Sequence, residues 1–184
     1  MTIRVLALVG SLRAGSHNRQ LAEAAMAHAP EGVEVDIFEG LAELPFYNED
    51  IDVAGSVPPA EAVRAAVAAS DALLLVSPEY NGTMPAVLKN AIDWLSRPFG
   101  ASAISGKPVA VIGAAFGTYG GVWAQDDARK AAGIAGGAVV EHLKLSVPGA
   151  GTRFADTHPA KDDEIAAEMP RILTVLADSV SRCS

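Results

Sequence analysis

Short apolar runs recur along the chain, and each is followed by a polar or glycine-rich loop and then by a stretch with helical periodicity. Three of these runs, 3–10, 71–77 and 107–114, are almost wholly apolar, which is typical of strands buried on both faces of a parallel sheet. The run 33–38 alternates apolar and acidic residues, as a half-exposed edge strand does. The expected strands are 3–10, 33–38, 71–77, 107–114 and 138–145, and the expected helices are 18–29, 59–69, 84–96, 122–133 and 162–182.

This strict alternation of strand and helix predicts an α/β fold with a parallel sheet. Right-handed crossovers then give a doubly wound, three-layer sandwich, and a polar second strand suits the strand order 2-1-3-4-5. The chain has 184 residues and shows no internal repeat, low-complexity tract or linker. We therefore expect residues 1–184 to form a single domain.

In such a sheet, ligands bind at the carboxyl ends of the strands, at the point where the strand order reverses. Here that point lies between the first and the third strand. The loops that deserve inspection are therefore 10–17 and 77–83, with 114–121 beside them.

Composition narrows the choice of partners. With 14 basic and 22 acidic residues the formal charge is −8, which disfavours nucleic acid and anionic membranes as main partners. No apolar stretch approaches the roughly 18 residues of a membrane span, and the first residues do not resemble a signal peptide. The single cysteine, Cys183, excludes an internal disulfide and is interpreted as a plain tail residue. A chain with a single cysteine fits a reducing compartment, so a cytoplasmic location is expected.

The loop after the first strand reads GSLRAGSHNR, residues 10–19. Its two glycines have the GxxxxG spacing of a nucleotide-binding P-loop, but Ser16 and His17 stand where that motif requires lysine and Ser/Thr. The dinucleotide pattern GxGxxG is also absent, because position 12 is Leu12. A nucleotide triphosphatase is therefore rejected, and a Rossmann NAD site is disfavoured.

What remains in this loop suits a terminal phosphate monoester. Ser11 and Ser16 offer hydroxyl groups, Arg13 offers a guanidinium, and the backbone N–H groups at the following helix start favour an anion. Asn18 can either donate its amide or cap the helix, and His17 can either pack at the rim or lie in solvent. The alternative interpretation is a polar, helix-capping loop with an exposed arginine.

The loop after the third strand reads SPEYNGTMP, residues 77–85. Asn81–Gly82 is a turn pair that tolerates positive φ. Thr83 is expected to cap the following helix, with Pro85 in its first turn. The resulting crest above the switch point can seat a planar heteroaromatic ring, for which Tyr80 supplies a face and Asn81 an amide.

Together, GSLRAGSHNRQLA and SPEYNGTMPAVLKNAIDW resemble the NADPH-dependent FMN reductase family. This family comprises flavodoxin-like flavoenzymes that include quinone, azo-dye and chromate reductases, and the resemblance extends from the first strand to about Arg129. It implies a flavodoxin-like fold, bound FMN, NADPH or NADH as co-substrate, and a small-molecule electron acceptor such as a quinone or flavin. It assigns the FMN phosphate to Ser11, Arg13, Ser16, His17 and Asn18, the isoalloxazine ring to Pro78, Glu79, Tyr80, Asn81 and Gly82, and neighbouring positions to Phe116 and Gly117.

The chain departs from the family pattern at two places. Ala115 stands where the family often has Ser or Thr, so one hydroxyl contact is missing. Trp123 stands where the family often has an arginine that serves subunit contacts. A homodimer is still expected, or a tetramer. Glu79 is interpreted as structural or as an interface residue rather than as a base, and Trp94 as a core residue or a dimer contact.

The resemblance implies a two-step hydride transfer, from NAD(P)H to FMN and then to an acceptor in the same place. Because the flavin supplies the redox chemistry, no side chain is predicted to be catalytic. The four histidines lack metal-ligand spacing, so no metal site is predicted. Two other hypotheses stay open: a flavodoxin-like electron carrier without NAD(P)H activity of its own, and a flavin-free relative that kept the fold for interaction.

Overall fold

The computed structural model describes residues 2–183, and its centre is a sheet of five parallel strands in the order β2-β1-β3-β4-β5. Both the predicted fold class and the predicted strand order are confirmed. The strands are β1 (Ile3–Val9), β2 (Val33–Ile37), β3 (Ala72–Val76), β4 (Pro108–Ala114) and β5 (Ala138–Val147). The helices are α1 (His17–Ala27), α2 (Pro58–Ala69), α3 (Ala86–Leu95), α4 (Val122–Ile134), α5 (Ala150–Arg153) and α6 (Asp163–Cys183), with 3-10 turns η1 (Gly40–Glu43), η2 (Glu49–Ile51) and η3 (Pro159–Lys161). No helix among these residues is both long and apolar enough to span a bilayer.

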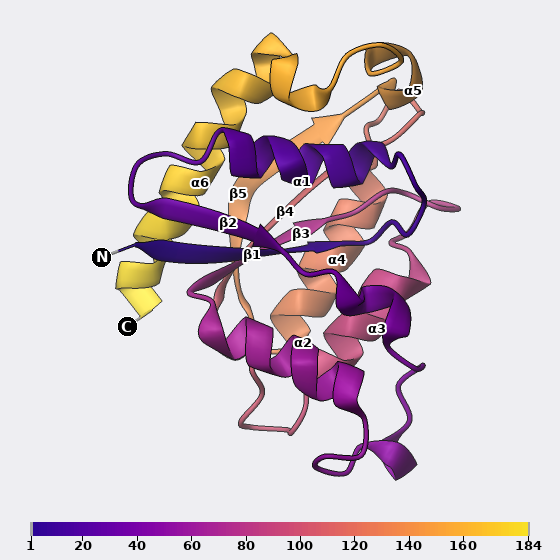
Figure 1. Cartoon of the computed structure of the whole chain (residues 1–184), viewed down its shortest axis with the longest axis vertical. Coiled ribbons are helices and arrows are strands. Elements are labelled where there is room, and N and C mark those ends of the chain that lie inside the picture. Colours follow the sequence, from indigo (N-terminus) through magenta and orange to yellow (C-terminus); the bar gives the residue numbers. More distant parts are fainter. Residues whose placement is uncertain (1, 184) are drawn as a thin grey trace.

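Helices cover both faces of the sheet (Figure 1). Helices α1 and α6 pack on one face, and α2, α3 and α4 pack on the other. Strand β3 is central, and all five of its residues are buried. Its apolar run therefore faces two cores at once, which is why it shows no alternation.

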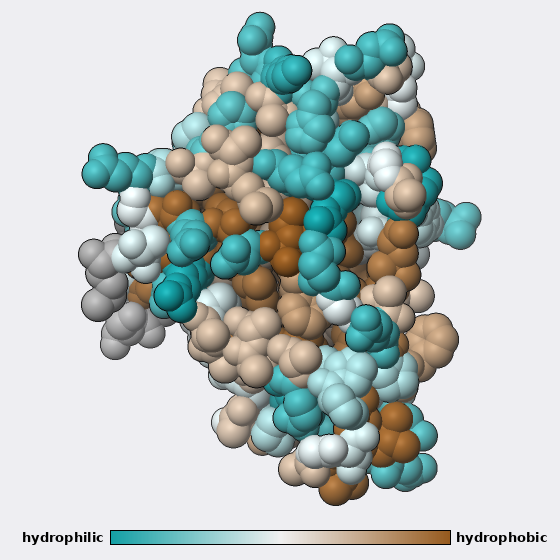
Figure 2. Space-filling view, in the orientation of Figure 1, coloured by the Kyte–Doolittle hydropathy of each residue, from teal (hydrophilic) through white to brown (hydrophobic). Residues whose placement is uncertain are grey.

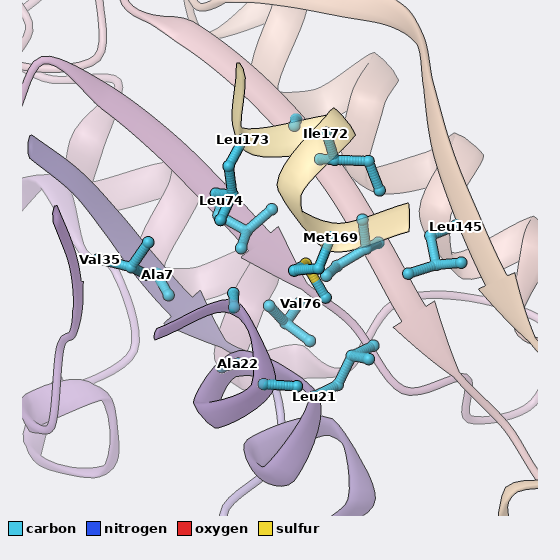
Figure 3. Close-up of a cluster of buried hydrophobic side chains, with 14 of the residues drawn as sticks. Ala7, Leu21, Ala22, Val35, Leu74, Val76, Leu145, Met169, Ile172 and Leu173 are labelled. Carbon is cyan, nitrogen blue, oxygen red and sulfur yellow. The ribbon is translucent and has the colours of Figure 1, made fainter. Parts of the chain in front are cut away.

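The core under α1 and α6 is aliphatic (Figure 3). Leu21 of α1 and Met169 of α6 project toward Leu74 and Val76 of β3. Full burial of a leucine side chain contributes about 1.5–3 kcal/mol, so small Ala, Val and Leu side chains suffice to stabilise this layer. The scarcity of aromatic residues is therefore no obstacle to the fold.

Strand β2 forms one edge of the sheet, as its alternating sequence predicts. Glu34 and Asp36 point away from the core, whereas Val35 is buried. Figure 2 views this side of the molecule, where hydrophobic surface forms a band between the layer of α1 and the layer of α2, with hydrophilic side chains over it. At the opposite edge, β5 shifts its register against β4 between Val109 and Val111.

The prediction that α3 begins at Met84 with Thr83 as its cap is wrong. The helix begins at Ala86, and Thr83 instead exchanges two backbone hydrogen bonds with Tyr80, at 3.1 and 3.2 Å. The reason is local: Met84 precedes Pro85, and a residue before proline is pushed out of the helical region. A helix therefore cannot run through Met84 from a cap at Thr83.

Residues 39–57 are more ordered than their polar sequence indicates. Leu41 and Leu44 are buried under the second core. The Asn90 side chain accepts from the Tyr47 N–H at 2.8 Å, and the Trp94 indole donates to the Pro45 carbonyl at 2.8 Å. Trp94 has no exposed surface, so the core interpretation of this residue is confirmed.

Candidate functional site

Three loops meet at the carboxyl edge of the sheet, at the right of Figure 1. The Gly10 N–H donates to the Val76 carbonyl at 2.8 Å, which joins the start of the first loop to the end of β3. A Cβ at Gly10 would lie 3.2 Å from Leu88 and 3.4 Å from Pro78, so glycine permits close packing of the first loop on the second. The predicted switch-point loops are thus in contact.

The first loop leaves its hydrogen-bond donors free. The backbone N–H groups of residues 11–15, 17 and 18 have no acceptor among residues 2–183. The same holds for the Ser11 hydroxyl, and the Arg13 guanidinium, which is exposed, contacts only the Ala14 carbonyl at 3.4 Å. Ser16 is buried and caps α1 by accepting from the Arg19 N–H at 3.3 Å. Free donors at the positive end of an 11-residue helix fit an anion such as a phosphate.

Asn18 donates its side-chain amide and does not cap α1, whose cap is Ser16. Its amide donates to the Ala114 carbonyl at 2.8 Å, and its oxygen accepts from the Ala114 N–H at 2.9 Å. The side chain is buried and bonds to the end of β4 through both its nitrogen and its oxygen. It thereby joins the first loop to the third, while the Asn18 backbone N–H has no acceptor among residues 2–183.

His17 packs at the rim of the site. Its ring lies 5.9 Å from Phe116 in a T-shaped arrangement and 5.9 Å from Phe154, and its Nδ1 lies 3.2 Å from Gln20 Oε1. Of the two positions considered from the sequence, the structure therefore has the packed one. The His17 ring thus connects the first loop with the third loop through Phe116.

The second loop makes the tight crest that its sequence predicts. Asn81 has φ of 54° and Gly82 has φ of 75°, so the turn pair adopts the left-handed backbone that suits these residues. Pro78 is buried at the base of the crest, and Tyr80 is 51% exposed at its top. The backbone N–H groups of residues 79, 81 and 82 have no acceptor among the described residues, which fits the polar edge of a flat ring.

Glu79 has a structural partner. One carboxylate oxygen accepts from the Ala124 N–H at 3.1 Å, at the N-terminus of α4. A carboxylate there satisfies an unpaired helix donor and complements the helix dipole. The structure thus agrees with the interpretation of Glu79 as structural, and the contact holds the second loop against the start of α4.

The third loop of the candidate site is residues 114–121, after β4. Ala115 is paired with β5 and α5, since its N–H donates to Val147 and its carbonyl accepts from Ala150, both at 3.0 Å. Beyond it, the N–H groups of residues 116–119 have no acceptor among residues 2–183. Phe116 is 73% exposed and lies over Gly151, where a Cβ would come within 2.2 Å of the ring. Gly117 is exposed and has open space beside it.

Comparison with known proteins decides the family. The family model described as NADPH-dependent FMN reductase matches residues 3–152. The chain belongs to the NADPH-dependent FMN reductase family. An NAD(P)H-dependent FMN reductase of Pseudomonas aeruginosa is 43% identical over 163 residues, covering 89% of this chain and 76% of that protein. A quinone reductase of Pseudomonas putida is 39% identical over 158 residues, covering 86% and 84%.

A solved structure shares the fold over nearly the whole chain. The flavoenzyme NAD(P)H:(acceptor) oxidoreductase FerB of Paracoccus denitrificans superimposes with a TM-score of 0.85 at 27% identity, covering 98% of each chain. The resemblance seen in the two motifs is therefore confirmed, and the family match extends past Arg129 to residue 152. It includes all three loops of the candidate site.

Sequence reasoning missed two features beside the family's third loop. Gln125 and Arg129 are buried on the inner side of α4, and Tyr119 and Trp123 form an exposed aromatic pair with centroids 5.2 Å apart. The sequence does carry a sign of the buried pair. Gln125 and Arg129 are four positions apart, and they lie on the same face of α4 as the buried residue Ala128. Burial lowers the pKa of Arg129, and Asp126 opposes that shift.

A groove leads away from the second loop between α3 and α4. It encloses about 1010 Å³ and runs from Tyr80 and Asn81 past Ile92 to Ile134. Phe99 and Ile134, which line it, are 92% and 80% exposed. Among residues 2–183, no group of three His, Cys, Asp or Glu side chains is placed to bind a metal ion.

Proposed function

We propose that the chain is an NAD(P)H-dependent, FMN-containing oxidoreductase that reduces a quinone, a flavin or a similar small acceptor. The observation that carries the proposal is the set of free donors in the first loop, at the switch point of a member of the FMN reductase family. FMN held there would supply the redox chemistry, a hydride transfer in two steps between NAD(P)H and the acceptor. We propose one FMN-binding domain over residues 1–184 and a cytoplasmic location.

The residues have separate tasks in this proposal. Ser11, Arg13 and the free N–H groups of residues 11–15, 17 and 18 bind the phosphate, and buried Ser16 keeps the helix start in place. The free N–H groups of the second loop and of residues 116–119 face the polar edge of the ring. Donors aimed there stabilise negative charge on that edge. Tyr80 and Phe116, whose rings are exposed beside these loops, supply aromatic surface next to the flavin.

We also propose a homodimer that forms through the groove between α3 and α4. A two-fold interface is self-complementary, and this groove combines exposed apolar side chains with charges of both signs, from Lys89, Asp93, Asp127 and Lys130. Because the groove starts at Tyr80 and Asn81, the partner would lie next to the ring site. Ile134→Asp should yield a monomer in light scattering, while the surface change Ile51→Asp should not.

The test of the function is spectroscopic. The purified protein, supplied with FMN, should show a bound-flavin absorbance spectrum, and NADPH or NADH added without oxygen should bleach it rapidly. A quinone added afterwards should restore the spectrum. Tight binding with slow bleaching would favour an electron carrier, and failure to take up FMN would support a flavin-free relative.

A further inference from the structure

The inner side of α4 carries two polar side chains that the redox chemistry does not use. Gln125 has no exposed surface, and Arg129 is 4% exposed. Burial of an amide or a guanidinium is costly unless its hydrogen bonds are made. Their partners therefore indicate what this pair is for.

The Gln125 amide joins the third loop to β5. Its nitrogen donates to the Gly120 carbonyl at 3.2 Å and to the Ser146 hydroxyl at 3.0 Å, so both amide hydrogens are engaged. Gly120 has φ of 63°, and a Cβ there would lie 2.7 Å from the Ser146 backbone. The amide thus fixes the loop at its closest approach to β5.

Arg129 determines which way the Gln125 amide points. Its Nη2 donates to Gln125 Oε1 at 3.2 Å and to the Val111 carbonyl at 2.9 Å, and its Nη1 donates to Asp126 at 2.9 Å. A guanidinium only donates, so the amide oxygen must face Arg129 and the amide nitrogen must face Gly120. The Val111 carbonyl lies where β5 shifts its register against β4.

We propose that Gln125 is a positioning residue for the flavin, oriented by Arg129 and acting through Gly120. It holds residues 116–121 in the shape in which their free N–H groups meet the ring. The inference rests on the proposed function, because it assumes that the third loop contacts FMN. Glu79 holds the same end of α4 against the second loop, so the start of α4 connects both ring-binding loops.

The test compares two buried amides. Gln125→Leu removes the bonds to Gly120 and Ser146 and the Gln125 oxygen that accepts from Arg129, and Asn90→Leu removes the bonds to Tyr47, Leu44 and Pro45. FMN affinity is measured by quenching of flavin fluorescence on the FMN-free protein, and NMR order parameters are measured for the backbone N–H groups of residues 116–121. Two net hydrogen bonds predict an FMN dissociation constant raised about tenfold for Gln125→Leu. The order parameters over the loop should also fall, whereas Asn90→Leu should leave both quantities unchanged at a comparable loss of melting temperature.

Gln125→Glu keeps the test decisive if Gln125→Leu does not fold. Its carboxylate still accepts from Arg129 but cannot donate to the Gly120 carbonyl, so the loop order parameters should still fall and the FMN dissociation constant should still rise. FMN affinity and loop order parameters equal to those of Asn90→Leu would overturn the inference. Wild-type protein that binds no FMN would instead contradict the proposed function, and the order parameters of the FMN-free protein would still decide whether Gln125 holds the loop.

Discussion

Two polar segments follow strands at the carboxyl edge of the sheet: residues 11–15 after β1 and residues 39–57 after β2. They differ in whether their polar groups are hydrogen-bonded within the protein. Residues 39–57 are tied to the protein, by the Asn90 and Trp94 bonds and by the ion pair between Arg64 and Asp52 at 2.9 Å. Residues 11–15 leave their N–H groups free, and Arg13 pairs with no carboxylate among the described residues. Both segments are polar, but the first loop keeps its donors free, whereas the second segment is bonded to the rest of the protein.

The largest effect on binding is expected from Arg13→Ala. Loss of a charged hydrogen bond should weaken FMN binding by about 1.5–3 kcal/mol. The measurement is a fluorescence titration, with Arg171→Ala as control, since that arginine pairs only with Glu168 on the surface. Unchanged FMN affinity in Arg13→Ala would remove the phosphate assignment and with it the contrast between the two segments.

Arg64→Met tests the structural segment. It removes the partner of Asp52 and the contact of the guanidinium with the Trp94 carbonyl at 3.1 Å. The free energy of unfolding should fall by about 1–2 kcal/mol, because a half-buried carboxylate loses its charged hydrogen bonds. Denaturant unfolding measures this, and FMN affinity should stay at the wild-type value. A loss of FMN affinity as large as that of Arg13→Ala would mean that the segment is not merely structural.

Asn81→Ala tests the proposed binding site of the flavin ring and is compared with Asn48→Ala in residues 39–57. Alanine lacks the amide and tolerates a φ of 54° poorly, so flavin binding or reduction should change by about 1 kcal/mol. Asn81→Gly separates the two causes, because glycine keeps the backbone and removes only the amide. Asn48→Ala in the structural segment should have a smaller effect, and equal effects would count against the ring assignment.

Gly151→Ala should have the smallest effect. The new methyl group would meet the Phe116 ring, but that ring is exposed and can turn away at a cost of about 0.5–1 kcal/mol. FMN affinity should decrease a few-fold. In a Phe116→Ala background the same change should have no effect, and an unaltered penalty there would show that Phe116 is not the element displaced.

Much of this arrangement follows from local sequence. The apolar runs give the strand order because buried parallel strands need no alternation, and Asn81–Gly82 gives the turn because few other pairs accept its backbone. The start of α3 could have been corrected from Pro85 alone. In contrast, Asn18 binds the backbone of Ala114 and Gln125 binds the hydroxyl of Ser146. Both partners lie far along the chain, so sequence reasoning could not identify them.

The most direct test of the account compares FMN with riboflavin, which has the same ring and no phosphate. The FMN-free protein is titrated with each, in wild type and in Arg13→Ala. Several charged hydrogen bonds to the phosphate predict that wild type binds FMN at least about a hundredfold more tightly than riboflavin. Arg13→Ala should reduce that preference while leaving riboflavin affinity unchanged. Equal affinity of wild type for the two flavins would contradict the central claim that the first loop receives the phosphate.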